Sequence, residues 1–121
     1  MPEQSPGLPP EVPEWIALPD IAERLGVAVT RVRDMVKDRR LLALRESAEG
    51  PLLVPAAFVA TEGPVKHLDA VIRLLDDAGY SDAEMVTWLF TPDATIPGTP
   101  ADALAANRGT EIKRRAQALG F

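Results

Sequence analysis

The sequence predicts a mainly α-helical fold, namely a winged helix-turn-helix with a small two-stranded wing followed by a C-terminal helical bundle. Three observations predict it. Residues 18–37 contain two short amphipathic segments separated by Gly26. Residues 41–54 hold two apolar runs on either side of a polar loop that contains glycine. Residues 67–119 carry apolar side chains at helical spacing, interrupted by proline and glycine.

Length and composition suit one compact domain or two very small ones. The chain has 121 residues, of which 46% are hydrophobic and 26% are charged. It has no cysteine, which excludes a disulfide framework and a thiolate zinc site. The first residues lack the basic and apolar regions of a secretory signal, and no apolar run is long enough to span a membrane. We therefore expect a cytoplasmic protein.

The chain divides into three predicted segments. Residues 1–14 contain five prolines and almost nothing to bury, which favours a disordered, proline-rich tail. Residues 15–60 form the predicted winged helix-turn-helix, and Trp15 and Ile16 mark its beginning by packing onto the first helix. Residues 61–121 form the predicted C-terminal helical domain.

The helix-turn-helix begins at Pro19. Proline has no N–H, and it fits the first position of a helix because an N–H there would have no partner within the helix. This helix runs to about Leu25, and Gly26 accepts the positive φ that a tight turn often requires. The second helix runs from Ala28 to about Asp38. The apolar residues that hold the two helices together are Ile21, Leu25, Val27, Val32 and Met35.

The wing is predicted from residues 41–44 and 52–54, two short strands joined by a polar loop. A hairpin directly after the second helix is the arrangement of a winged helix-turn-helix, and Arg45 lies at its base. Residues 56–59 should form a short helical turn.

Three or four helices are expected in the C-terminal segment. The first covers residues 67–78. Ser81 opens a capping box of the form S-x-x-E and starts a helix through Phe90. Residues 91–100 form a rigid loop, after which Thr99 caps a further helix. The last helix covers about residues 110–119.

Charge is unevenly distributed along the chain. The net charge is −5, but residues 24–45 carry seven cations against only two acids. Phosphate contacts respond to the local patch more than to the total charge. The sequence therefore predicts that double-stranded DNA is the partner, bound with modest affinity and strong salt dependence by a transcriptional regulator or a nucleoid-associated factor.

The second helix supplies most of the candidate DNA contacts. Side chains early on such a helix usually meet base edges, and residues at its end usually meet the sugar-phosphate backbone. The wing base can reach phosphate or the adjacent minor groove. The candidate DNA-binding residues are Thr30, Arg31, Arg33, Lys37, Arg39, Arg40 and Arg45. An ordinary pair of packed helices in a protein-interaction module is the alternative explanation of the same pattern.

Nothing in the sequence suggests catalysis. His67 is the only histidine and has no neighbouring acids or cysteines, and each serine has a place in the tail, the wing loop or a helix cap. No glycine-rich loop could cradle a phosphate. We expect no enzyme, no metal and no other cofactor.

The chain resembles a small actinobacterial family of winged helix-turn-helix DNA-binding proteins whose C-terminal helical domain has a poorly defined role. The stretches that carry this resemblance are LPDIAERLGVAVTRVRDMVKDRRLLAL, VPAAFV, LLDDAGYSDAEMVTWLFTPD and RRAQAL. It covers about residues 18–121 and implies DNA binding through the helix at residues 28–37 and the wing. It also suggests a Ser/Thr kinase as a partner that acts on the tail, where Ser5 is the only hydroxyl residue.

A second, shorter resemblance concerns residues 88–119, which look like the C-terminal module of certain bacterial antitoxins. Pro100, Asp102 and Leu104 follow the pattern of that module. It implies an interaction module whose C-terminal helices bind a toxin-like protein partner. Helix-turn-helix proteins usually read operators as dimers, so a homodimer is a further candidate assembly.

Overall fold

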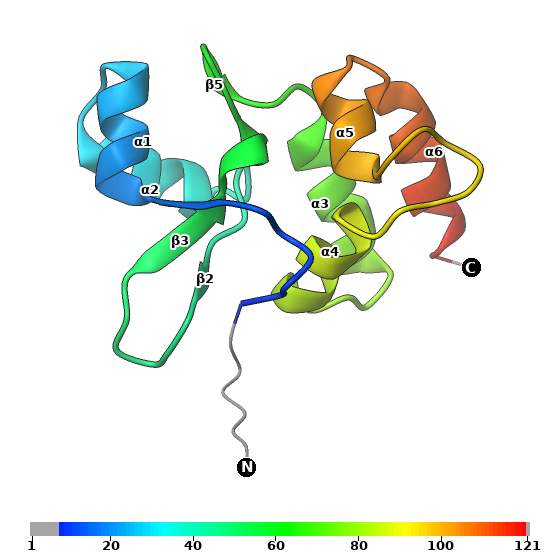
Figure 1. Ribbon diagram of the computed structural model, residues 1–121, viewed down its shortest axis with the longest axis horizontal. Helices are drawn as coiled ribbons and strands as arrows, with labels where there is room; N and C mark the ends of the chain where they lie inside the picture. The colour runs from blue at the N-terminus through cyan, green and yellow to red at the C-terminus, as the bar shows by residue number, and fades with distance from the viewer. Residues whose placement is uncertain (1–7, 121) are drawn as a thin grey trace.

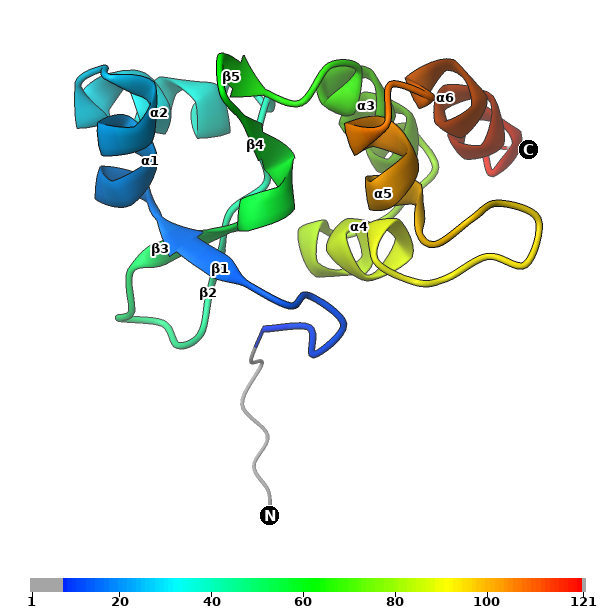
Figure 2. The same cartoon turned by 45° about the horizontal axis from the view of Figure 1, so that its top comes forward.

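The computed structural model describes residues 8–120, and Figure 1 shows two groups of elements side by side. One group holds the helix-turn-helix and the wing, and the other holds the four C-terminal helices. Figure 2 shows the same separation after rotation, with a short hairpin between the two groups. The predictions for residues 1–7, including Ser5, lie outside the described residues. Within residues 8–120, none of the helices has the length and apolar character needed to cross a membrane.

The predicted helix-turn-helix is confirmed. It consists of α1 (Leu18–Leu25) and α2 (Val29–Lys37), which pack against each other. Gly26 follows α1 with a φ of 70°, and the N–H of Val27 donates to the carbonyl of Ala22 at 3.0 Å. This left-handed residue turns the chain within a few positions because glycine adopts positive φ without a Cβ penalty. The buried side chains of the pair are Leu18, Ile21, Ala22, Val32 and Met35.

The wing is present, but its sheet contains a third strand. The expected hairpin is β2 (Leu44–Arg45) against β3 (Leu52–Pro55), and β1 (Trp15–Ala17) pairs with the other edge of β3. Both pairings are antiparallel, with Ile16 opposite Val54 and Leu44 opposite Leu53. Trp15 and Ile16 thus begin the fold as a strand, because the free edge of β3 offers them backbone hydrogen bonds.

The proline-rich tail predicted for residues 1–14 differs from the structure at its end. Pro9 and Val12 are buried, and the carbonyl of Glu14 accepts a hydrogen bond of 2.9 Å from the N–H of Ala56. A buried valine and a backbone hydrogen bond give residues 8–14 enough contact to pack against the fold, despite their high proline content.

The connection between the two groups contains more regular structure than the sequence predicts. The expected helical turn is η1 (Ala56–Phe58). Residues 61–64, which open the segment predicted as the C-terminal helical domain, belong to a hairpin of β4 (Val59–Ala60) and β5 (Gly63–Pro64). The N–H of Val65 then donates to the carbonyl of Phe58 at 2.9 Å, which holds the hairpin against η1.

The C-terminal group contains α3 (Leu68–Asp77), α4 (Asp82–Leu89), α5 (Pro100–Ala105) and α6 (Gly109–Ala118). The expected capping box of α4 is present, with Glu84 accepting from the N–H of Ser81 at 2.8 Å. Thr99 and Asp102 form a second box at α5. The core is continuous across both groups, because the ring centroids of Phe58 and Phe90 lie 5.5 Å apart.

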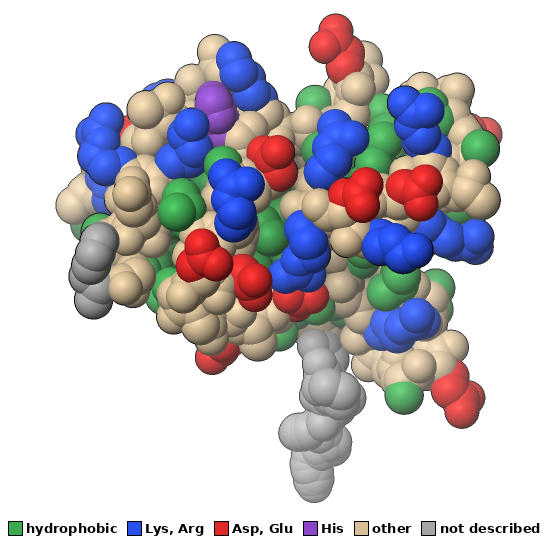
Figure 3. Space-filling view, turned by 180° about the vertical axis from the view of Figure 1, so that it is seen from behind, with side chains coloured by type: hydrophobic (Ala, Val, Ile, Leu, Met, Phe, Trp, Pro, Cys, Tyr) green, Lys and Arg blue, Asp and Glu red, His purple; other side chains and the backbone are tan. Residues whose placement is uncertain are grey.

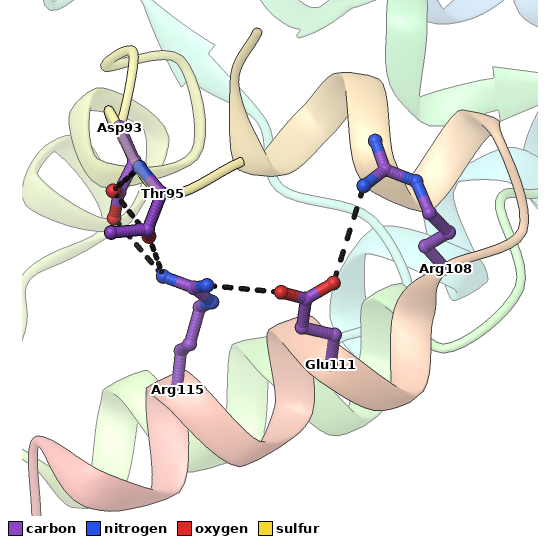
Figure 4. Close-up of polar contacts among 5 residues, drawn as sticks. All are labelled: Asp93, Thr95, Arg108, Glu111 and Arg115. Atoms are coloured by element: carbon purple, nitrogen blue, oxygen red, sulfur yellow. Dashed lines mark hydrogen bonds and ion pairs between the residues drawn. The ribbon is translucent and has the colours of Figure 1, made fainter. Parts of the chain in front are cut away.

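The loop between α4 and α5 is fastened to α6 by Arg115, as Figure 4 shows. The Arg115 guanidinium donates to Asp93 at 3.3 Å, to Glu111 at 2.9 Å and to the hydroxyl of Thr95. Thr95 in turn donates to Asp93 through its hydroxyl at 2.7 Å and its N–H at 2.8 Å. These two hydrogen bonds, together with the charge of Arg115, lower the pKa of the Asp93 carboxyl.

We predict that Gly109→Ala destabilises the protein. A Cβ at this position would lie 2.8 Å from the Cβ and Cγ of His67, closer than side chains approach. Alanine usually stabilises a helix relative to glycine, but here we expect a loss of about 1–3 kcal/mol in the free energy of unfolding. Urea unfolding measures it, and Gly120→Ala, whose Cβ would meet only the Gln117 carbonyl at 3.4 Å, is the matched control. Equal effects of the two substitutions would contradict the proposed clash.

We predict that Thr95→Val raises the pKa of Asp93 toward its ordinary value of 3.8, because the carboxylate loses one donor. Ionised Asp93 stabilises the fold above the pKa of the unfolded chain, and this stabilisation disappears as the pH falls through the lowered pKa of the folded state. The variant should therefore lose it at a higher pH. Carboxyl ¹³C titration by NMR measures the shift. Thr91→Val, which removes a hydroxyl bonded to the Thr87 carbonyl, should leave Asp93 unchanged.

Candidate nucleic-acid interface

Helix α2 has one buried face and one polar, exposed face. Val32 and Met35 are buried against the core, which fixes the rotation of the helix about its axis. The rest of the helix surface exposes Thr30, Arg31, Arg33, Asp34 and Lys37. Because the buried residues determine which side faces outward, the structure presents these candidate side chains on a rigid support.

Within residues 8–120, the cations exposed on α2 form no ion pair with an acid. Among residues 8–120, no carboxylate lies within 4.0 Å of the charged groups of Arg31, Arg33 or Lys37 in an ion pair. Asp34 and Asp38 are exposed nearby and reduce the local positive charge. The remaining excess is positive, and Figure 3 shows Lys and Arg side chains on the half of the molecule that contains α1 and α2.

The wing holds a further arginine in place. The Arg45 side chain is exposed at the base of the hairpin, and its Nη1 donates to the carbonyl of Gly50 across the loop at 2.6 Å. A guanidinium has five N–H donors, so this one bond leaves others directed to solvent. Arg45 is thus fixed beside the wing while it keeps its charge available.

Arg39 and Arg40, which follow the end of α2, differ in their contacts. Arg40 is exposed, whereas Arg39 has a φ of 65° and donates through both terminal nitrogens to Asp82, at 3.1 and 2.9 Å. A carboxylate oxygen of Asp76 lies 4.0 Å from the same guanidinium. The hydrogen bond to Asp82 raises the pKa of Arg39, and burial opposes the rise only in part. Arg39 is expected from the sequence to contact phosphate, but here an acid of α4 already holds it.

Asp76 and Asp82 are the members of this region that the sequence does not indicate. Arg39 and Asp82 are 43 residues apart, and only the packing of α4 beside the end of α2 brings them together. No local sequence pattern predicts such an ion pair. An acid in the first turn of a helix is common because it interacts favourably with the helix dipole, so Asp82 alone does not indicate a distant partner.

The residues of the antitoxin-like pattern have roles within the fold. Pro100 and Leu104 are buried, and Asp102 caps α5 by accepting from the N–H of Thr99 at 3.0 Å. The half-buried Trp88 and Tyr80 line a hollow of about 590 Å³ on the outer side of α4.

His67 precedes α3 with a φ of 73°, and its ring lies against Gly109 of α6. Its position is explained by the packing of these two helices. Among residues 8–120, no three of His, Cys, Asp and Glu gather in a group that could hold a metal ion.

Comparison with known proteins gives matches along almost the whole chain. Residues 1–59 match a family described as "DNA-binding protein Rv2175c, wHTH domain", and residues 65–120 match "Rv2175c C-terminal domain of unknown function". The DNA-binding protein Rv2175c of Mycobacterium tuberculosis is 36% identical over 127 residues, which cover 94% of this chain and 85% of that protein. The NMR structure of Rv2175c superposes with a TM-score of 0.77 at 32% identity and covers all of both chains. The expected resemblance to an actinobacterial winged helix-turn-helix family is thus confirmed, and the chain belongs to the Rv2175c family.

Proposed function

We propose that this protein binds double-stranded DNA, with α2 in the major groove and the wing beside it. The observation that carries the proposal is the face of α2, where Arg31, Arg33 and Lys37 are exposed and without acid partners among the described residues. The relative from M. tuberculosis is named a DNA-binding protein, which supports the same function for this chain.

Within this proposal, the candidate residues divide by their place on the helix. Thr30, Arg31 and Arg33 lie in the first half of α2 and face base edges, where arginine can pair with guanine through two hydrogen bonds. Lys37, Arg40 and the wing residue Arg45 contact phosphates. Arg39 contributes fully only when it leaves Asp82, because the carboxylate occupies one donor of each terminal nitrogen and offsets the charge of the guanidinium.

We also propose that the protein regulates transcription and that two copies bind together. A single helix-turn-helix buries too little surface for high specificity, so operators are usually read by dimers. The exposed Asp34 and Asp38 oppose phosphate binding, which makes a second copy more important for affinity.

We predict that Arg31→Ala with Arg33→Ala weakens DNA binding by roughly tenfold per arginine and flattens its dependence on salt. Fluorescence anisotropy with a labelled duplex over a salt series measures both quantities. The matched control is Lys113→Ala with Arg114→Ala, which removes the same charge from α6, where neither residue has an ion pair within residues 8–120. If this control abolishes binding while the α2 variant binds normally, α2 is not the DNA-contacting helix.

Selection of genomic fragments by the purified protein tests the regulatory proposal. We expect enriched fragments to lie upstream of genes and to contain two related half-sites whose centres are about one helical turn, roughly 10 base pairs, apart. Enrichment without any shared sequence would instead indicate binding to the DNA backbone alone and would contradict a sequence-reading role.

A further inference from the structure

The C-terminal domain presents acids to the cations at the end of α2. Asp82 begins α4 and Asp76 lies near the end of α3, and both carboxylates are close to Arg39. A hollow between the two groups of elements is lined by Arg39 and Arg40, with Asp38, from one side, and by Asp69 and Asp76, with Arg73, from the other. The domain thus places its own negative charges at the edge of the proposed DNA site.

The contact between Arg39 and Asp82 has the form of a phosphate contact. Two parallel N–H donors of one guanidinium meet the two oxygens of one carboxylate, at 3.1 and 2.9 Å. Arginine binds a phosphate with the same paired geometry. The two N–H groups bonded to Asp82 cannot bond a phosphate at the same time, and the carboxylate charge repels a phosphate that approaches the remaining donors. Asp82 therefore competes with a duplex phosphate for Arg39.

We propose that the C-terminal domain is an intramolecular competitor of the DNA backbone, in which Asp82, assisted by Asp76, occupies Arg39 and lowers the affinity of the winged helix for DNA. This function rests on the DNA binding proposed above and assigns a task to a domain whose family description gives none.

The exposure of the pair limits the size of the effect. The side chains of Arg39 and Asp82 are each 42% exposed, so water and salt screen their attraction. An exposed ion pair shifts an equilibrium by no more than about fivefold. A pair of this strength is reversible, and its loss should be measurable without unfolding the domain.

The test compares the full chain with Asp82→Asn, using anisotropy with a labelled duplex over a salt series. We expect the variant to bind about two- to fivefold more tightly at low salt. Its plot of log K against log salt should steepen by about 0.9, the change for one additional neutralised phosphate. Asp77→Asn is the matched control, because it removes the same charge from the exposed end of α3, where Asp77 makes no ion pair within residues 8–120.

A double-mutant cycle identifies Arg39 as the group that is released. Arg39→Ala should leave the salt slope of the otherwise unchanged chain as it is and should cancel the steeper slope of Asp82→Asn. Asp76→Asn, which keeps the cap region of α4 intact, should give a smaller gain in affinity because its carboxylate is 4.0 Å from Arg39. Thermal unfolding of every variant verifies that the fold is retained.

Three outcomes would overturn the proposal while leaving DNA binding in place. These are equal effects of Asp82→Asn and Asp77→Asn, a steeper slope that persists when Arg39 is removed, and a flatter slope for Arg39→Ala alone. By contrast, a chain that binds no duplex at low salt would contradict the proposed function itself.

Discussion

The central strand β3 is the constraint on which the geometry of the winged helix-turn-helix depends. It pairs with β1 on one edge and with β2 on the other. Strand β1 leads directly into α1 without an intervening residue, and α1 packs against α2. The start of the helix-turn-helix and the wing are therefore attached to opposite edges of one strand. Because backbone hydrogen bonds fix the register at both edges, the wing and α2 keep a defined relation to each other.

The same half is joined to the C-terminal helices by packing as well as by charge. The rings of Phe58 and Phe90 are in contact range, and η1 packs against α5. These apolar contacts place the start of α4 beside the end of α2, and the ion pair between Arg39 and Asp82 follows from that placement. An exposed ion pair by itself is too weak to orient two domains. The apolar contacts therefore hold the two groups of elements together. The ion pair between Arg39 and Asp82 affects only the proposed binding of DNA.

The features that the sequence predicts correctly are those with a local cause. Gly26 turns the chain, and Ser81 and Thr99 cap helices, because each acts on residues within a few positions of itself. Strands β1, β4 and β5 are too short to show alternation, and Pro64 of β5 is a residue that strands usually avoid, so only their partners reveal them. Burial of Val12 is likewise hidden within a proline-rich segment.

For the candidate site, the sequence predicts which side chains are exposed, but it does not predict which of them form ion pairs. The helical period of α2 predicts Val32 and Met35 as buried residues, and the structure exposes both Arg33 and Arg31, the latter one turn before Met35. The same reasoning treats Arg39 like its neighbour Arg40, because both follow the helix and carry the same charge. The two arginines differ because Arg39 bonds Asp82, a residue of another helix. Tertiary contacts of this kind cannot be predicted from local sequence spacing.

In the proposed complex, the acidic character of the chain lowers the affinity for every duplex and leaves selectivity to the base contacts. The net charge is −5, so most of the surface repels a duplex, and attraction is confined to α2 and the wing. Binding to arbitrary DNA depends almost entirely on phosphate contacts, which this repulsion and the engagement of Arg39 by Asp82 both weaken. Base contacts from the first half of α2 are affected less, because they depend on short-range hydrogen bonds. If the same phosphate contact is lost from both modes of binding, the two affinities fall by the same factor, and their ratio, which decides occupancy of a site in a genome, is determined by the base contacts.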